Sequence, residues 1–228
     1  MTLLELIEVN NMSDSIILIK PSFEFGSLNI LNDLTIAYQR DMSVSVHYDQ
    51  DYFNKYINYE DTEISKKLND FRTSITSKYC NSVLDIGIGS GEFIKKYKNK
   101  AFGYDINPYA VKTLKQKDIY VDPYLDNLDG IDGFTMWDVL EHIKNPDILL
   151  NKIPKTKIVI VSIPIFDNIL EVKQSKHYRP NEHYYYYTIN GLIKFFDQMK
   201  YTIIEVSDQE SVCGRESITS FVFRKDGD

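Results

Sequence analysis

The sequence predicts an α/β protein in which a largely parallel sheet is covered by helices on both faces. Three observations predict it: short apolar runs alternate with helical segments from residue 80 onward, one run is apolar without the alternation of polar and apolar residues, and the last two runs are joined only by a loop. Alternating strands and helices give crossover connections, which place parallel strands side by side. The run without alternation, residues 158–163, is therefore expected in the middle of the sheet.

The predicted elements follow one another in a regular order. Apolar runs predict strands at Ser82–Ile86, Ala101–Tyr104, Ile119–Val121, Phe134–Trp137 and Lys157–Ile163. Apolar residues at helical spacing predict helices between them at Glu92–Tyr97, Asn107–Gln116 and Pro146–Ile153. A helix at Ile189–Met199 then precedes strands at Tyr201–Val206 and Ile218–Phe223. We expect these last two strands to pair antiparallel, because no crossover helix separates them.

The residues before this pattern are less regular. We expect an N-terminal arm over residues 1–45, whose apolar runs follow no single period, and a helical cap over residues 46–79. Within the cap, Asp61, Thr62 and Glu63 open a helix that is predicted to continue to about Ser77. Residues 80–228 form the expected core domain.

Composition limits the classes of function. The chain has 228 residues and a formal net charge of −7, which disfavours sequence-independent binding to nucleic acid, because such binding depends on Lys and Arg. Its longest apolar stretch is far shorter than the roughly 20 residues that cross a bilayer, and no secretion signal is visible. Cys80 and Cys213 form no CxxC motif. We expect a cytoplasmic protein that acts on a small molecule, of undetermined oligomeric state.

A glycine-rich turn follows the first strand of the pattern. Glycines at 87, 89 and 91 let the backbone approach a ligand, and the helix that follows offers free N–H groups. A dinucleotide-binding turn would need a further glycine at position 92, where Glu92 would repel a pyrophosphate, so a nicotinamide enzyme is disfavoured. Asp105 ends the next strand, where a carboxylate can accept both hydroxyls of a ribose. The alternatives are a tight structural turn and a helix cap at Asp105.

The glycine turn and Asp105 resemble motifs of the class I S-adenosylmethionine-dependent methyltransferases. So does a third segment, Trp137-Asp138-Val139-Leu140-Glu141-His142-Ile143. The resemblance covers roughly residues 80–228 and is nearest to the branch of quinone-biosynthesis methyltransferases and its unassigned bacterial and phage relatives. It implies a Rossmann-like seven-stranded sheet of order 3-2-1-4-5-7-6, with an antiparallel last strand and helices on both faces. It also implies S-adenosyl-L-methionine as the cofactor.

The resemblance implies roles for individual residues. The methionyl amine and carboxylate would be held by Asp85 and the turn of Gly87, Gly89 and Gly91. Asp105, with its neighbour Ile106, would hold the ribose, Asp122 would border the adenine, and the backbone at Trp137 would line the methionine portion.

Two further groups are candidates for the acceptor side. Asp138, Glu141 and His142 stand at i, i+3 and i+4 of an expected helix, so they would face one way and could act as acid and base or bind a divalent metal. The alternative is helix capping and packing, and we assign no metal. Glu141 and His142 are the catalytic candidates. Arg72, on the helix before the first strand, is expected in a solvated salt bridge.

The segment His177–Tyr187 follows the fifth strand, where the related methyltransferases build a substrate lid. His183 is predicted as a base, and His177, Arg179 and Tyr184 as substrate-binding residues. The alternative is a polar loop packed on the sheet edge.

The function that follows is transfer of a methyl group to a small-molecule or nucleotide-like acceptor, with O-, N- and C-methylation left open. A non-catalytic sensor or assembly subunit that binds S-adenosylmethionine or S-adenosylhomocysteine is the alternative.

Overall fold

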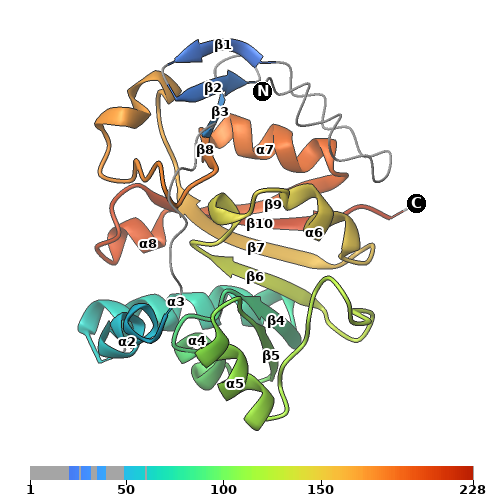
Figure 1. The fold of residues 1–228 in the computed structure, drawn as a ribbon. Coiled ribbons are helices and arrows are strands. Elements are labelled where there is room, and N and C mark those ends of the chain that lie inside the picture. The colour runs from blue at the N-terminus through green and yellow to red at the C-terminus, as the bar shows by residue number, and fades with distance from the viewer. Residues whose placement is uncertain (1–20, 26, 32–34, 40–48, 60, 228) are drawn as a thin grey trace.

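The computed structural model describes residues 21–25, 27–31, 35–39, 49–59 and 61–227. A six-stranded sheet with helices on both faces forms its centre, and a smaller four-stranded sheet lies beyond one of these helical layers (Figure 1). The apolar runs at Leu3–Ile7 and Ile16–Ile19 fall outside the described residues. Among the residues described, no helix has both the length and the apolar character needed to cross a membrane.

The central sheet has the order β5-β4-β6-β7-β10-β9. Its strands are β4 (Ser82–Ile86), β5 (Lys100–Tyr104), β6 (Gly133–Trp137), β7 (Ile158–Pro164), β9 (Tyr201–Ser207) and β10 (Ile218–Lys225). The first four are parallel to one another, and β10 is antiparallel to both of its neighbours. The predicted α/β fold with an antiparallel strand at its end is thus confirmed, and β7 lies inside the sheet as expected.

The strand predicted at Ile119–Val121 is reduced to one bridge, between Gly103 and Tyr120. The N–H of Gly103 donates to the carbonyl of Ile119, and the N–H of Val121 donates to the carbonyl of Gly103. The chain then turns at Asp122, and Pro123 has no N–H with which to extend the ladder. The sheet therefore has six full strands, with this bridge where a seventh was expected.

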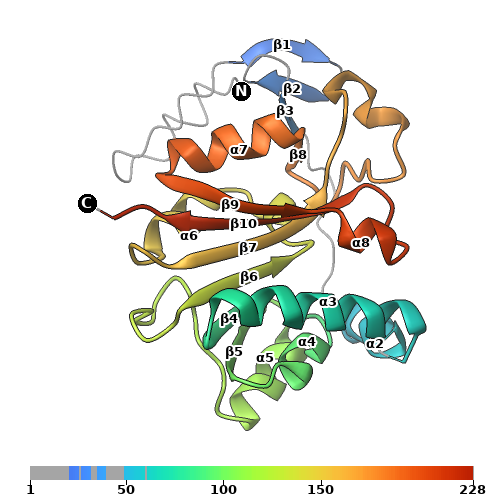
Figure 2. The same ribbon diagram turned by 180° about the vertical axis from the view of Figure 1, so that it is seen from behind.

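Alternate strand residues face two helical layers. Val83 and Ile160 pack with α3 (Glu63–Tyr79) and α4 (Glu92–Lys96), and α3 lies in front of the sheet in Figure 2. Leu84 and Val161 face the opposite way, toward α6 (Pro146–Lys152) and α7 (Ile189–Gln198). This alternation is what the two-residue period of a strand requires when both faces are buried.

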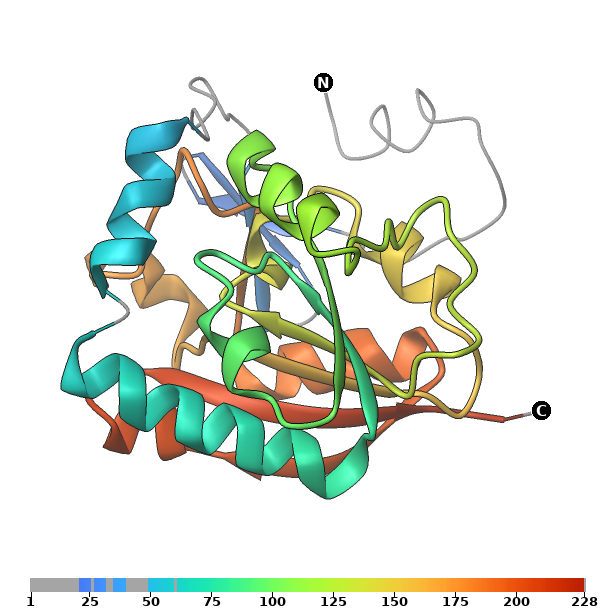
Figure 3. The same ribbon diagram turned by 90° about the horizontal axis from the view of Figure 1, so that it is seen from below.

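The helices around the β4–β5 end of the sheet are α2 (Gln50–Tyr59), α3, α4 and α5 (Pro108–Gln116) (Figure 3). α3 begins as its sequence indicates, because the Thr62 hydroxyl caps it by accepting the N–H of Ser65 at 3.1 Å. Asn107 caps α5 in the same manner. Residues of α2, α3 and α4 contribute to the wall of the cavity described below.

The smaller sheet joins the N-terminal strands to the segment that follows β7. β1 (Pro21–Phe25), β2 (Leu28–Leu31) and β3 (Ile36–Gln39) are successive antiparallel strands, and β8 (Tyr185–Tyr187) pairs with β3. One face of this sheet packs on the α7 side of the core and the other on η2 (Ile169–Gln174). The described part of the N-terminal arm therefore covers the segment predicted as a lid, and part of that segment is a strand rather than a loop.

The helix expected after β6 is instead a single 3₁₀ turn, η1 (Leu140–His142). The carbonyl of Glu141, which an α-helix would bond to residue 145, accepts the N–H of Tyr184 at 2.8 Å. Asp138 precedes η1 with a left-handed φ of 56°. The predicted arrangement of Asp138, Glu141 and His142 on one helix face is therefore wrong. Asp138 instead pairs with Arg215.

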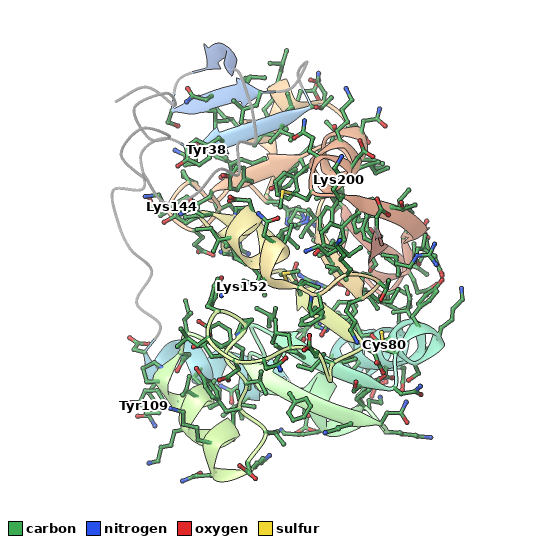
Figure 4. All side chains as sticks on the ribbon, turned by 90° about the vertical axis from the view of Figure 1, so that its right-hand side faces the viewer. Tyr38, Cys80, Tyr109, Lys144, Lys152 and Lys200 are labelled. Carbon is green, nitrogen blue, oxygen red and sulfur yellow. The ribbon has the colours of Figure 1, made fainter. Side chains whose placement is uncertain are left out.

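Both cysteines are free. Cys80 lies in the interior between α3 and the sheet, and its side chain is labelled in Figure 4, as is that of Tyr109 on α5. Tyr109 is exposed, whereas Cys80 is buried. Burial raises the pKa of the Cys80 thiol to about 12. This cysteine is therefore an inert core residue.

The contact between α7 and the small sheet gives a stability prediction. A Cβ on Gly191 would lie 2.1 Å from the carbonyl oxygen of Thr35, so Gly191→Ala must push the two segments apart. We expect a loss of about 1–3 kcal/mol in the free energy of unfolding, measured by urea denaturation, although alanine favours a helix. Gly130→Ala, where a Cβ meets nothing within 4 Å, is the control. Equal stability of the two variants would contradict this contact.

Candidate functional site

A cavity of about 620 Å³ lies at the carboxyl ends of β4, β5 and β6. In an open α/β sheet this edge is where ligands bind, and the volume suits a small-molecule ligand. Its walls also include α3, α2 and the segment after β7. The lining residues at the ends of these strands and just after them include Ile86, Gly87, Ile88, Gly89, Ser90, Tyr104, Asp105, Ile106, Asn107, Trp137, Asp138, Val139, Glu141, His142 and Ile143.

The glycine turn after β4 has a backbone that excludes side chains. Gly87, Gly89 and Gly91 have φ values of 75°, 55° and 80°, in the left-handed region. A Cβ on Gly87 would lie 2.4 Å from Cγ2 of Val139. Gly87 and Gly89 line the cavity, whereas Gly91 does not line it and caps α4. The turn therefore presents bare backbone to a ligand.

Asp105 is fixed at the end of β5. Its carboxylate accepts the N–H of Asn107 at 2.8 Å and the N–H of Gly89 at 3.2 Å. A carboxylate has about four lone-pair positions, so capacity for two further hydrogen bonds remains. Burial raises the pKa of Asp105, although these N–H groups oppose the shift. This carboxylate can accept two neighbouring hydroxyls of a ligand.

The aromatic rings of Tyr104 and Tyr124 stand beside Asp105, with their centroids 5.9 Å apart. Both line the cavity and offer apolar surface to a flat ring system. Asp122 does not line the cavity; its carboxylate accepts the N–H of Tyr124 at 2.9 Å. Asp122, which was expected to border the adenine, therefore lies outside the cavity, and its neighbour Tyr124 lines it instead.

Asp85 is the most deeply buried carboxyl on the β4 side of the cavity, with 1% exposure. It accepts the hydroxyl hydrogen of Thr135 at 2.7 Å. Burial raises the pKa of Asp85 to about 8, and the Thr135 hydroxyl and the Arg72 charge only partly oppose this. The indole N–H of Trp137 is also buried and has no partner among the described residues. An incoming cationic group would restore the charge of Asp85.

An ion-pair network closes the side of the cavity next to α3. Glu210, of the short helix α8 (Gln209–Val212), is fully buried and accepts Nε of Arg72 at 2.7 Å and a guanidinium N–H of Arg215 at 3.0 Å. Arg215 also forms a bidentate pair with Asp138, and the Arg72 guanidinium lies 5.0 Å from the Trp137 ring centre. The expectation of a solvated salt bridge for Arg72 is wrong, because its side chain is only 13% exposed.

These pairs set the protonation of the network. Although burial alone would raise the pKa of Asp138, Arg215 and Arg72 hold it below its ordinary value. The carboxylates of Asp138 and Glu210 in turn outweigh the effect of burial on Arg215 and raise its pKa. Arg215 therefore stays charged.

The three predicted catalytic residues lie together where η1 and the segment after β7 line the cavity. Glu141, His142 and His183 have ligand atoms within 4.8 Å of one another. Both Glu141 oxygens are buried and have no hydrogen-bond partner among the described residues. Nδ1 of His142 lies 3.0 Å from the carbonyl of Glu182, and the rings of His142 and His183 are 4.6 Å apart. The structure thus unites side chains from η1 and from the segment after β7.

Two of the three predicted substrate-binding residues line the cavity, and the third does not. His177 and Arg179 line the cavity, where Nε2 of His177 lies 2.8 Å from the carbonyl of Glu216 and Arg179 pairs with Glu182 at 3.0 Å. Tyr184 does not line the cavity, and its ring packs against the main core. Sequence reasoning missed Glu210, because one acidic residue in a polar loop carries no local signal of burial.

Comparison with known proteins gives a family match. The sequence matches the family described as "Methyltransferase domain" over residues 56–206, which is more than half of the chain. That range includes the glycine turn, Asp105 and the cluster of Glu141, His142 and His183. No curated protein matches the sequence.

Solved structures share the fold at low sequence identity. A S-adenosylmethionine-dependent methyltransferase from Clostridium acetobutylicum is 14% identical, with a TM-score of 0.55 over 77% of this chain and 99% of that chain. A putative methyltransferase solved with the Haloferax volcanii Trm112 activator is 13% identical, with a TM-score of 0.58 over 81% and 100%. The 1,6-didemethyltoxoflavin-N1-methyltransferase of Burkholderia thailandensis is 12% identical, with a TM-score of 0.52 over 91% and 100%. These are similarities of fold.

The network around Glu210 predicts a large stability effect. Glu210→Gln removes a fully buried negative charge that pairs with two partly buried guanidinium groups, so we expect a loss of about 3–5 kcal/mol in the free energy of unfolding. Chemical denaturation followed by circular dichroism measures the loss. Glu216→Gln makes the same chemical change in the same connection between β9 and β10, at an exposed residue paired with Lys176, and should leave stability nearly unchanged. Similar losses in both variants would show that Glu210 does not stabilise the fold.

Proposed function

Because the chain belongs to the methyltransferase domain family, as a class I S-adenosylmethionine-dependent methyltransferase, we propose that its cavity transfers a methyl group to a small-molecule or nucleotide-like acceptor. The observation that carries this proposal is the fixed Asp105 carboxylate beside the glycine turn, in a cavity that also holds Glu141, whose buried carboxyl has no hydrogen-bond partner among the described residues. One end suits the cofactor and the other the acceptor.

The residues around Asp105 and the glycine turn fit the cofactor. We assign the ribose hydroxyls to Asp105, with Ile106 beside it, and the adenine to the space next to Tyr104 and Tyr124. Asp85 and the turn of Gly87 and Gly89 would hold the methionyl amine and carboxylate. The cofactor supplies an electrophilic methyl group on a sulfonium.

The other end is assigned to the acceptor. His183, His142 and Glu141 are proposed to contact it, with His177 and Arg179 at the rim. These residues orient the acceptor in line with the methyl group, and the segment that contains β8 keeps water away. A nearer relationship to the quinone-biosynthesis branch is supported only by the motif from Trp137 to Ile143.

Transfer of a labelled methyl group tests the function. Purified protein is incubated with methyl-labelled S-adenosylmethionine and small-molecule fractions of cell extract, and we expect a labelled product of low molecular mass. Cofactor binding without a labelled product from any fraction would instead favour a non-catalytic sensor or assembly subunit.

The ribose assignment predicts a change in cofactor affinity. Asp105→Ala removes the acceptor of two ligand hydroxyls and should weaken S-adenosylhomocysteine binding by about 1–3 kcal/mol, measured by isothermal titration calorimetry. Asp129→Ala, an exposed carboxylate that does not line the cavity, serves as the control and should bind as the wild type does. Unchanged affinity in Asp105→Ala would refute the assignment.

The raised pKa of Asp85 predicts proton release on binding. Below its pKa of about 8 the free carboxyl is mostly protonated, and a ligand ammonium group beside it favours the ionised form. S-adenosylhomocysteine affinity should therefore rise as the pH increases from about 6 to about 8. Calorimetry in buffers of different ionisation enthalpy measures the released proton. Asp85→Asn should bind without proton release, and a wild type that releases none would contradict this contact.

A further inference from the structure

We propose that Glu141, His142 and His183 bind a divalent transition-metal cation at the acceptor end of the cavity. The inference rests on the proposed function only in calling this end the acceptor side. In the sequence, Asp138, Glu141 and His142 form a possible metal set with capping and packing as the alternative, and nothing places His183 beside them.

The Glu141 carboxylate is the first reason. It lines the cavity with 2% exposure, and neither oxygen has a hydrogen-bond partner among the described residues. Burying a carboxylate without a partner is costly, so buried carboxylates are usually paired or coordinate a metal. The nearby cationic side chains are used elsewhere: Arg215 pairs with Asp138 and Glu210, and Arg179 pairs with Glu182.

The two imidazoles are the second reason. A carbonyl oxygen can only accept, so Nδ1 of His142 donates its hydrogen to the carbonyl of Glu182 at 3.0 Å, and the lone pair is left on Nε2. Metal-binding histidines are characteristically held in this way. His183 is 4% exposed, and its ring has contacts with the rings of His142 and Tyr186.

The spacing and type of the donors indicate which cation fits. The three ligand atoms lie within 4.8 Å of one another, and ligands of one zinc ion lie roughly 3.4 Å apart, so small side-chain rotations would close the set. Two imidazoles and one carboxylate suit zinc and similar transition metals, whereas magnesium prefers oxygen ligands and retains several waters. Three protein ligands leave a position open toward the cavity.

That open position suits an oxygen-bearing acceptor. A cation there attracts an acceptor hydroxyl or carboxylate to the end of the cavity where the predicted catalytic residues meet. It also lowers the pKa of a coordinated hydroxyl. The acceptor class that fits is therefore a hydroxylated small molecule.

Calorimetric titration of the full chain with zinc chloride, without cofactor, tests the site. We expect one ion bound per chain and an affinity at least about tenfold lower in Glu141→Gln, which keeps the shape of the side chain, and in His183→Ala. Glu182→Gln and His177→Ala are matched controls, because they change a carboxylate and a histidine of the same cavity outside the set. Both controls should bind zinc as the wild type does.

The outcomes separate the two proposals. Wild-type affinity in Glu141→Gln, or no zinc binding by the wild type, would overturn the metal site. Far-ultraviolet circular dichroism shows that each variant is folded. Stabilisation by S-adenosylhomocysteine of a wild type that binds no zinc would leave the proposed function standing. Zinc binding by a wild type that S-adenosylhomocysteine does not stabilise, lost in both folded ligand variants, would support the metal site alone.

Discussion

The burial of Glu210 is the constraint on which the cavity depends. Its carboxylate is fully buried and holds Arg72 from α3 and Arg215 from the loop before β10, and Arg215 also holds Asp138 at the end of β6. Charges that have been removed from water are favourable only when they are paired and hydrogen-bonded, so none of these residues can move without exposing another. One network thereby fixes three distant segments around the ligand site.

This network also determines the chemistry at the two ends of the cavity. Arg72 and Arg215 form their ion pairs with Glu210 and Asp138, so their charges only partly oppose the effect of burial on Asp85 and Glu141. Asp85 has its pKa raised to about 8 chiefly by burial, which prepares it for a cationic ligand group. Glu141 remains without a partner among the described residues and lies beside two imidazoles. The two ends of the cavity, proposed for the cofactor and for the acceptor, are therefore chemically different.

Short-range sequence patterns were sufficient to predict the six full strands of the central sheet. They were also sufficient to predict the turn and the carboxylate at the end of the cavity proposed for the cofactor. The turn of Gly87 and Gly89 and the carboxylate of Asp105 are readable in sequence, because a tight strand-to-helix turn and a strand end are local features. The small sheet was not readable, since β3 pairs with β8 almost 150 residues away. Its contact with α7 through Gly191 and Thr35 depends on the same long-range packing.

By itself, the sequence determined the α/β class, the strand order through its resemblance, and the residues of the glycine turn. These depend on periodicity and on neighbours within one strand, turn and helix. The tertiary structure alone decided that Arg72 is buried, that Asp138 turns away from Glu141, and that His183 joins His142. The physical reason is that a side chain's partner is set by which distant segments share a low-dielectric interior, and burial leaves no mark in the residue or its neighbours along the chain.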